Sequence, residues 1–439
     1  MPSEEYVREL EARVKRLEAF ARSLERENRE LRAENRRLLE RVQRKRELVH
    51  EPPAFVKPEA GAREAMPSGR PVGHEGVSRR TPEEIHEHAK LKPVKKCPDC
   101  GKPVGVKRWR KRVVTRLIPG RLENVEYAIP EGYCNGCCRS VEPVVPNALP
   151  NSRFDLTLAL WIACLRMLGV SVDKVRFLLQ TDYSLRVSSA TVINSCSKLA
   201  GFLGEDYEQL RSELLKEKQA HGDETSWRVK GRNWWLWEFI GKRVAYFTIR
   251  HSRGQKVPEQ VMRGFKGVFT SDFWSAYNCL SCEKQKCWVH LKRELDKVLK
   301  YRHSHEFAIF ASRLTRLYYW AKSERNHGSK TRQFAEKRLH SLLSQEYKNK
   351  DCKRLVKRLL RHEKELFTFC AHRGALAENN HAERGIRPAV VIRKTTFGSQ
   401  SEHGAANTAV LMSFFQTARL QDTNFIEYLQ ETVNNRLQH

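Results

Sequence analysis

A change of hydrophobic pattern near residue 219 limits the possible folds of this chain more than anything else in its sequence. The preceding residues, 154–218, have the spacing of helices, whereas the following ones form runs of β-branched and aromatic residues separated by short turns. These runs predict strands at residues 219–229, 234–240 and 244–250, a helix at 257–262 and a fourth strand at 267–271. The order predicts a mixed α/β domain over residues 219–439.

Two aspartates lie at the predicted ends of strands in this domain. We place Asp223 at the end of the first strand, and Asp272 directly follows the fourth. Carboxylates at the ends of adjacent strands can hold a pair of Mg²⁺ ions, which stabilise the attacking and leaving oxygens of a phosphoryl displacement. Taken singly, each aspartate is more often a turn residue than a ligand. Three strands, a helix and a fourth strand are, however, the opening order of the RNase H-like fold.

The N-terminal segment, residues 1–48, carries a seven-residue repeat. Its two seam positions hold Leu10, Leu17, Leu24, Leu31 and Leu38, and Val7, Val14, Ala21, Asn28, Asn35 and Val42. Leucine at one position and asparagine at the other favour a parallel coiled coil, so we predict self-association at least to a dimer. A single solvated helix is the alternative. Residues 49–96 are rich in Pro and Gly and predict a flexible linker with one short helix near residues 82–91.

Two Cys-x-x-Cys pairs mark residues 97–150. The pairs are Cys97 with Cys100 and Cys134 with Cys137, and β-like residues lie between them. Because Zn²⁺ takes four thiolates tetrahedrally, this spacing predicts a zinc ribbon, with Cys138 as a bystander. Unliganded cysteines are the alternative. Metal binding also suits the scattered remaining cysteines better than a disulfide-stapled, secreted fold does.

The charge of the chain favours a nucleic-acid partner. The formal net charge is +29, and a basic run between the cysteine pairs contains Arg108, Trp109, Arg110, Lys111 and Arg112. Cations in such a run can contact phosphate and the indole can lie against sugar or base, although a solvated strand edge would look similar. There is neither a membrane-spanning apolar run nor a secretory signal, so we expect a cytoplasmic protein without a membrane partner.

The helical pattern of residues 151–218 has two interpretations of equal weight. A short segment at residues 181–187 separates two predicted helices, as in a helix-turn-helix that binds DNA. A plain helical packing domain fits the pattern equally well. The basic helical stretch farther on, at about residues 295–375, is predicted to be an insertion into the catalytic domain that contacts DNA, and a solvated helical face is its alternative.

Five motifs in one order resemble those of transposases of the insertion sequence 66 family. The Asp223-Glu224-Thr225 run is similar to the family's DET motif, and residues 271–278 resemble its second-aspartate motif. Residues 287–293 and 379–388 are similar to its Cys-Trp-Ala-His and Asn-Asn-x-x-Glu-Arg motifs, and the tail motif lies at residues 393–399. Phe273 and Trp274 depart from the usual Gly and Tyr, and neither removes a ligand.

The resemblance implies a DDE-type DNA transposase with an RNase H-like catalytic domain. Glu383 would be the third metal-binding acid, on a helix that approaches Asp223 and Asp272, with Glu378 as the competing choice. Two Mg²⁺ or Mn²⁺ ions would bind there. Water would cleave a phosphodiester at the end of the element, and the freed 3′-OH would then attack target DNA without a covalent protein intermediate.

Further residues receive roles from the same motifs. The predicted DNA contacts are His290, Arg293, Arg384, Arg387, Arg393 and Lys394. Asn379 and Asn380 are predicted to cap a helix rather than to bind metal. A second zinc set of Cys279, Cys282, Cys287 and His290 stays open.

Two other functions also stay open. One is a zinc-dependent DNA-binding regulator without catalytic activity, derived from a transposase. The other is a nuclease for RNA–DNA hybrids or branched DNA.

Overall fold

The computed structural model describes residues 82–118, 120–323, 328–372 and 374–437. These residues belong to one compact unit of the chain. The predicted coiled coil at residues 1–48 and the linker up to residue 81 lie outside the described residues, so both stay predictions.

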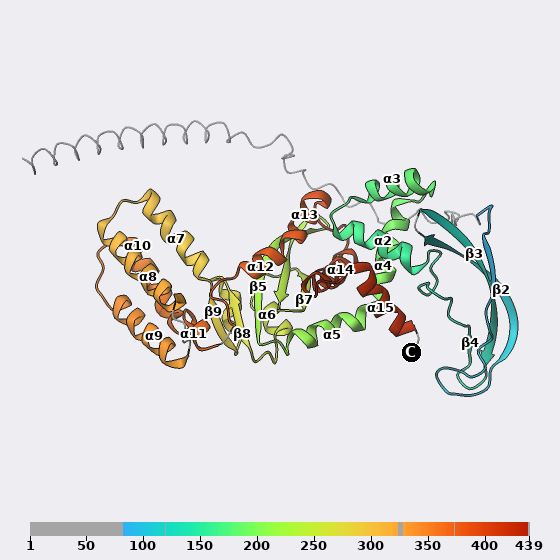
Figure 1. The fold of residues 1–439 in the computed structure, drawn as a ribbon, viewed down its shortest axis with the longest axis horizontal. Helices are drawn as coiled ribbons and strands as arrows, with labels where there is room; N and C mark the ends of the chain where they lie inside the picture. Colours follow the sequence, from blue (N-terminus) through green and yellow to red (C-terminus); the bar gives the residue numbers. More distant parts are fainter. Residues whose placement is uncertain (1–81, 119, 324–327, 373, 438–439) are drawn as a thin grey trace, which may run out of the picture. The chain divides into compact units, whose positions relative to one another are not determined.

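The central sheet has five strands in the order β7-β6-β5-β8-β9 (Figure 1). Its strands are β5 (Gln219–Val229), β6 (Arg232–Ile240), β7 (Ala245–Arg250), β8 (Val268–Ser271) and β9 (Glu283–Lys286). The first three are antiparallel to one another, and β8 and β9 add in parallel on the other side of β5. The four predicted strands and the helix α6 (Lys256–Val261) are confirmed, and each of their ends lies within two residues of the predicted position. The short β9 was not predicted.

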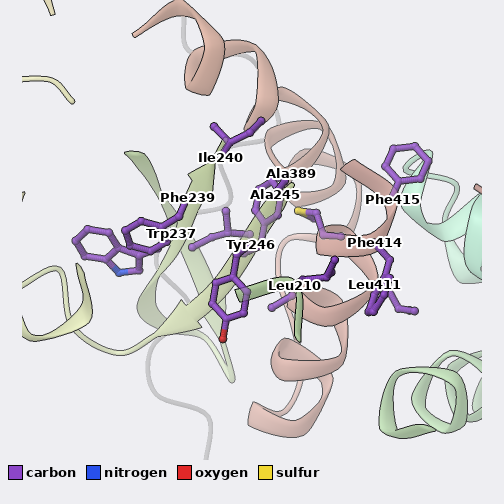
Figure 2. Packing of buried hydrophobic residues seen from close by; sticks show 14 of the residues in the cluster. Leu210, Trp237, Phe239, Ile240, Ala245, Tyr246, Ala389, Leu411, Phe414 and Phe415 are labelled. Atoms are coloured by element: carbon purple, nitrogen blue, oxygen red, sulfur yellow. The ribbon is translucent and has the colours of Figure 1, made fainter. Parts of the chain in front are cut away.

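Aromatic residues fill the sheet's interior because strands buried by helices have an apolar face to cover. Trp237, Phe239 and Phe247 are fully buried. Figure 2 shows Trp237 and Phe239 side by side at the left of the cluster and Leu411 and Phe414 of α14 (Glu402–Leu420) at its right. The edge strand β7 is also sealed by this helix, because Ser413 and Thr417 accept hydrogen bonds from Phe247 N and Ala245 N at 2.8 and 3.0 Å.

The C-terminal end differs from the prediction of one helix at residues 404–429. Two helices are present, α14 and α15 (Phe425–Leu437). Asp422, between them, has φ +53°, a left-handed conformation that ends a helix. The apolar pattern runs through this break because both helices pack on the same core. No described helix is long and apolar enough to cross a membrane.

The residues before the sheet form a long hairpin and a group of helices. The hairpin strands β2 (Gly105–Ile118) and β3 (Arg121–Cys134) are antiparallel, and β1 (Glu87–Lys90) and β4 (Arg139–Val141) pair with β3. The short helix predicted near residues 82–91 is wrong, because that segment contains β1, which pairs in parallel with β3. The predicted helices are α2 (Leu156–Met167), α3 (Val172–Tyr183) and α4 (Ser189–Phe202), followed by α5 (Gly204–Leu214). The helix-turn-helix remains a prediction.

A second helical group follows β9, the last strand of the central sheet along the chain (Figure 1). It consists of α7 (Trp288–Tyr301), α8 (His305–Ser323), α9 (Ser329–Leu343), α10 (Lys350–Arg361), the 3-10 turn η2 (Glu363–Glu365) and α11 (Thr368–Ala371). It has its own hydrophobic core, which includes Trp288 and Phe367. The group begins at α7, a few residues before the predicted start near residue 295. The chain then returns to the sheet through α12 (Asn380–Gly385) and α13 (Arg387–Thr396).

Candidate active site

The two aspartates come level with each other on neighbouring strands. β5 and β8 pair in parallel from Gln219 opposite Val268 to His221 opposite Thr270. The same offset along both strands aligns Asp223 with Asp272, and neighbouring strands lie about 4.8 Å apart. Asp272 directly follows β8, as predicted. Asp223, in contrast, lies inside β5 rather than at its end, because β5 continues beyond β8 to pair with β6.

The electrostatics of Asp223 indicate that both Asp272 and Glu383 lie near it. Burial raises the pKa of Asp223 to about 7, and the neighbouring charge of Glu224 adds to the rise. The carboxylates of Asp272 and Glu383 raise the pKa further. Asp223 and Asp272 therefore lie on adjacent strands with Glu383 of α12 nearby, although the three carboxylates are not all within 4.8 Å of one another in the described part of the chain.

Glu383 is held by two residues that were predicted to touch DNA. Arg293 of α7 donates to its two carboxylate oxygens at 3.3 and 3.2 Å, and His290 Nδ1 lies 3.7 Å from Oε1. The competing acid, Glu378, instead pairs with Lys322 and accepts a hydrogen bond from Tyr318 at 2.8 Å. The Glu378 carboxylate is therefore bound by side chains of α8, and Glu383 is the one of the two acids whose charge acts on Asp223.

Asn379 fixes the position of the helix that carries Glu383. It stands at the N-cap position of α12, as predicted, but its side chain forms no capping bond. The amide instead donates to Gly222 O of β5 at 2.9 Å and lies 3.2 Å from His221 Nδ1. Burial lowers the pKa of His221 to about 3, so its ring is neutral. Because the Asn379 amide oxygen can only accept, His221 Nδ1 is the donor of this hydrogen bond. The predicted capping bond is wrong because β5 competes for this side chain.

Glu224 points to the opposite face of β5, where it supports the loop after Asp272. It accepts hydrogen bonds from Tyr277 at 2.6 Å and from Arg253 at 2.8 Å. The Arg253 guanidinium lies between the rings of Trp235 and Trp274, 4.4 and 3.9 Å from their centroids. No sequence pattern pointed to this arrangement, because its members are far apart along the chain.

Trp274 also contacts Asp272 within this loop. Its backbone N–H donates to Asp272 Oδ1 at 2.8 Å, which orients that carboxylate. Phe273, the other departure from the family motif, packs against the insertion, with the Arg358 guanidinium 4.6 Å from its ring centroid. Beneath the loop, the buried Lys286 ammonium donates to Asp272 O at 3.0 Å, and burial lowers its pKa.

Glu238 is a buried acid beside the site that our sequence analysis missed. It lies directly opposite Asp223 in the pairing of β5 with β6 and is 0% exposed. Neither carboxylate oxygen has a hydrogen-bond partner among the described residues. Burial, followed by the charge of Asp223, raises its pKa well above the usual value. An acid inside an otherwise apolar strand was the available signal.

The four cysteines of the predicted ribbon form one cluster. The sulfurs of Cys97, Cys100, Cys134 and Cys137 all lie within 4.8 Å of one another, and this is the one such group of three or more possible ligands in the described part of the chain. The Cys97–Cys137 and Cys100–Cys134 sulfur distances are 3.9 and 3.5 Å. Tetrahedral Zn²⁺ with bonds of about 2.3 Å requires sulfur separations of about 3.8 Å. The cluster therefore fits a zinc ion.

The proposed second zinc set is not brought together. Cys287 is buried and accepts a hydrogen bond from Asn379 N at 3.1 Å, while Cys279 donates to Ala276 O at 3.2 Å. These two thiols serve packing and backbone contacts, and Cys282 and His290 form no metal group with them within the described residues.

The basic run of β2 is largely engaged by neighbouring acids. Arg108 pairs with Glu131, Arg110 with Glu142, and Lys111 with Glu126. Arg112 is half-buried and donates to the carbonyls of Ser152 and Leu149. Trp109 is exposed, with Lys90 4.8 Å from its ring centroid. Arg112 thus supports the fold, while Trp109 stays accessible.

The predicted basic residues beside Glu383 fall into two groups. Arg393 is tied to β5, with hydrogen bonds to Thr225 Oγ1 at 2.7 Å and Ser226 O at 2.8 Å. Arg384, Arg387 and Lys394 are exposed along α12 and α13. Only the second group is available for a partner on this surface.

Comparison with known proteins identifies the family. The family described as "Transposase IS66 family" matches residues 162–407, which is more than half of the chain. The uncharacterized protein y4qI of Sinorhizobium fredii (strain NBRC 101917 / NGR234) is 23% identical over 278 residues, covering 53% of this chain and 51% of that protein. The chain thus spans about half the length of this relative. On the family match, this chain belongs to the IS66 family of transposases.

Proposed function

We propose that this protein is a DDE-type DNA transposase whose catalytic acids are Asp223, Asp272 and Glu383. The observation that carries the proposal is the alignment of Asp223 with Asp272 on β5 and β8, with Glu383 close enough to raise the pKa of Asp223. An acid cluster on adjacent strands of a mixed sheet is what metal-dependent phosphoryl transfer needs.

The donor set fits magnesium or manganese. All three candidates are carboxylates, the ligands that these hard cations prefer. When two such ions are bound, they stabilise charge on the attacking and leaving oxygens of the phosphodiester. Arg293 donates to both oxygens of the Glu383 carboxylate and would be released toward DNA phosphate when Glu383 becomes a ligand.

Basic side chains next to Glu383 provide a surface for the DNA backbone. A groove between α7 and α10 is lined by Arg293, Lys297, Arg302, Lys350 and Arg354. It also contains Asp351 and Glu294, which pair with Arg302 and Arg354. Arg384, Arg387 and Lys394 extend the positive charge along α12 and α13. These cations would hold phosphates while water cleaves the element end and the resulting 3′-OH attacks the target.

The remaining parts are proposed to arrange the DNA and the subunits. Zn²⁺ in the Cys97 cluster would stabilise the open end of the β2–β3 hairpin, and Trp109 on β2 would contact DNA. The helices α3 and α4 are candidates for a helix-turn-helix, and residues 1–48 for a dimeric coiled coil. Such a protein would work at the nucleoid of a prokaryotic cell.

The test is a metal-dependent cleavage and joining assay. Its substrate is a duplex that carries an inverted repeat bracketing this gene, together with flanking DNA. We expect the zinc-loaded full chain to cut and join in Mg²⁺ or Mn²⁺. The variants Asp223→Asn and Glu383→Gln should lose at least about 10³-fold in rate, since removing a ligand disables the ions.

Other results would point to other functions. If Asp223→Asn cuts as well as the parent protein, the catalytic proposal fails. Tight binding without any cleavage would support the regulator. Cleavage of RNA–DNA hybrids or branched DNA without joined products would support the nuclease.

A further inference from the structure

Glu238 occupies a place where an acid has no ordinary structural reason to be. The carboxylate is fully buried on β6, and both oxygens lack a hydrogen-bond partner among the described residues. Burying an ionisable group without a partner costs several kcal/mol, so folded proteins rarely keep one without a function. Its neighbour Glu224 shows the contrast, because that buried carboxylate is bound by both Arg253 and Tyr277.

The position of Glu238 aims it at the proposed metal centre. Glu238 is the direct cross-strand partner of Asp223, and side chains of such a pair project from the same face of a sheet. Asp223 is in turn level with Asp272 on the next strand. Three acids thus form a row across β6, β5 and β8, with neighbouring strands about 4.8 Å apart.

The helix that carries Glu383 closes over this carboxylate. A Cβ atom added to Gly385 of α12 would lie 2.1 Å from Glu238 Oε1 and 2.8 Å from Ile240 Cδ1. Glycine at this position therefore leaves the space that the Glu238 carboxylate occupies beneath α12. The same short helix carries Glu383, whose charge acts on Asp223, and Gly385, which contacts Glu238.

We propose that Glu238 supplies a fourth carboxylate to the metal centre of Asp223, Asp272 and Glu383. The proposal rests on the proposed function, since it adds a ligand to that same site. A divalent cation beside Asp223 provides the partner that both Glu238 oxygens otherwise lack. It also explains why an apolar residue does not stand at this position of β6.

The experiment measures cation binding directly, without DNA or turnover. Mn²⁺ is titrated into the zinc-loaded full chain and followed by electron paramagnetic resonance of the free ion. The variants are Asp223→Asn, Glu238→Gln and Glu238→Asp. The control is Asp351→Asn on α10, which removes a buried acid paired with Arg302 at 2.9 Å, away from the sheet.

We expect Glu238→Gln to bind Mn²⁺ about 10- to 100-fold more weakly than the parent, the usual cost of losing a supporting group at a metal site. Glu238→Asp, which keeps the charge, should recover part of this loss. The melting temperature of metal-free Glu238→Gln should stay close to that of the parent, because a carboxyl that burial keeps in its neutral form is replaced by a neutral amide of similar size. Asp351→Asn should melt earlier and bind Mn²⁺ normally.

The variants separate this inference from the function on which it rests. If Asp223→Asn loses Mn²⁺ binding while Glu238→Gln keeps the parent affinity, the fourth ligand is refuted and the transposase proposal stands. If neither variant changes the affinity, the proposed metal centre itself is wrong. A Glu238→Gln protein that unfolds, with Glu238→Asp unfolding too, assigns Glu238 a structural role and also overturns the inference.

Discussion

If Asp223 is a metal ligand, as we propose, it should couple metal binding to pH. Burial and the surrounding acids raise its pKa to about 7, compared with an ordinary value of 3.8. Between pH 3.8 and about 7, Asp223 is therefore still protonated in the metal-free folded protein, whereas it is already ionised in the unfolded chain. This proton stabilises the fold at low pH, and the stabilisation is lost as the pH rises toward 7.

A cation must displace that proton, so affinity should rise with pH. We predict that the apparent Mn²⁺ affinity increases at least about tenfold per pH unit below pH 7, because binding releases the proton of Asp223. Titrations of the full chain between pH 5.5 and 8.5 measure this slope. A flat profile would show that Asp223 is already ionised or is not a ligand.

The neighbouring residues show which parts of the site are visible in a sequence. Asp223, Asp272 and Glu383 lie in local motifs, so they could be predicted as candidates, and their role as metal ligands stays a prediction. The contacts made by Asn379, Arg253 and Lys286 could not be predicted, because the fold alone brings their partners close. Arg293 was expected to contact phosphate, yet it binds Glu383, since the sequence does not show which anion is nearest.

Among the helices and strands, the local hydrophobic pattern predicts what packs locally. The strands β5, β6 and β7 were predictable because their apolar runs alternate with turn residues. β1 and β9 were not, since they are short and polar and become strands only by pairing with β3 and β8. The break at Asp422 was missed because α14 and α15 both contribute to one continuous core.

The hairpin of β2 and β3 provides a prediction about zinc. The full chain should contain about one Zn²⁺ held by the four clustered cysteines, and Cys137→Ser should lose it because three thiolates bind the ion less well than four. The thiol cluster without a cation is unfavourable, and its hydrogen bonds raise the pKa of Cys137 to about 12. Elemental analysis after dialysis measures the metal content.

The adjacent Cys138 offers a matched control. It is exposed and lies outside the cluster, so Cys138→Ser should keep its zinc and melt like the parent. Zinc loss from both variants would show that the ion binds elsewhere. Mn²⁺ binding at the acid row should survive zinc loss, because Asp223 lies on a different sheet.

The chain as a whole is strongly cationic, and this predicts how it should respond to salt. With a net charge of +29, its affinity for duplex DNA should fall steeply as salt rises, through the release of counterions. Replacing both Arg384 and Arg387 by Gln should weaken binding and reduce the slope of log Kd against log salt by about two, because each arginine neutralises about one phosphate.

Arg121→Gln serves as the comparison for this variant. Arg121 is exposed but already paired with Glu123 at 2.8 Å on the hairpin, so its replacement should change the slope little. Equal slopes for both variants would mean that the surface along α12 and α13 does not meet DNA.

The helical group α7 to α11 leaves and re-enters the sheet at a single place. Cys287 N donates to Ser271 O at 2.9 Å as the chain departs, and Trp288 N donates to Ala377 O at 3.0 Å as it returns. Since entrance and exit are bonded to each other, the excursion can grow, shrink or change its surface without pulling on Asp272 or on the helix of Glu383. The proposed acid site can therefore stay constant while the surface of the helical group changes.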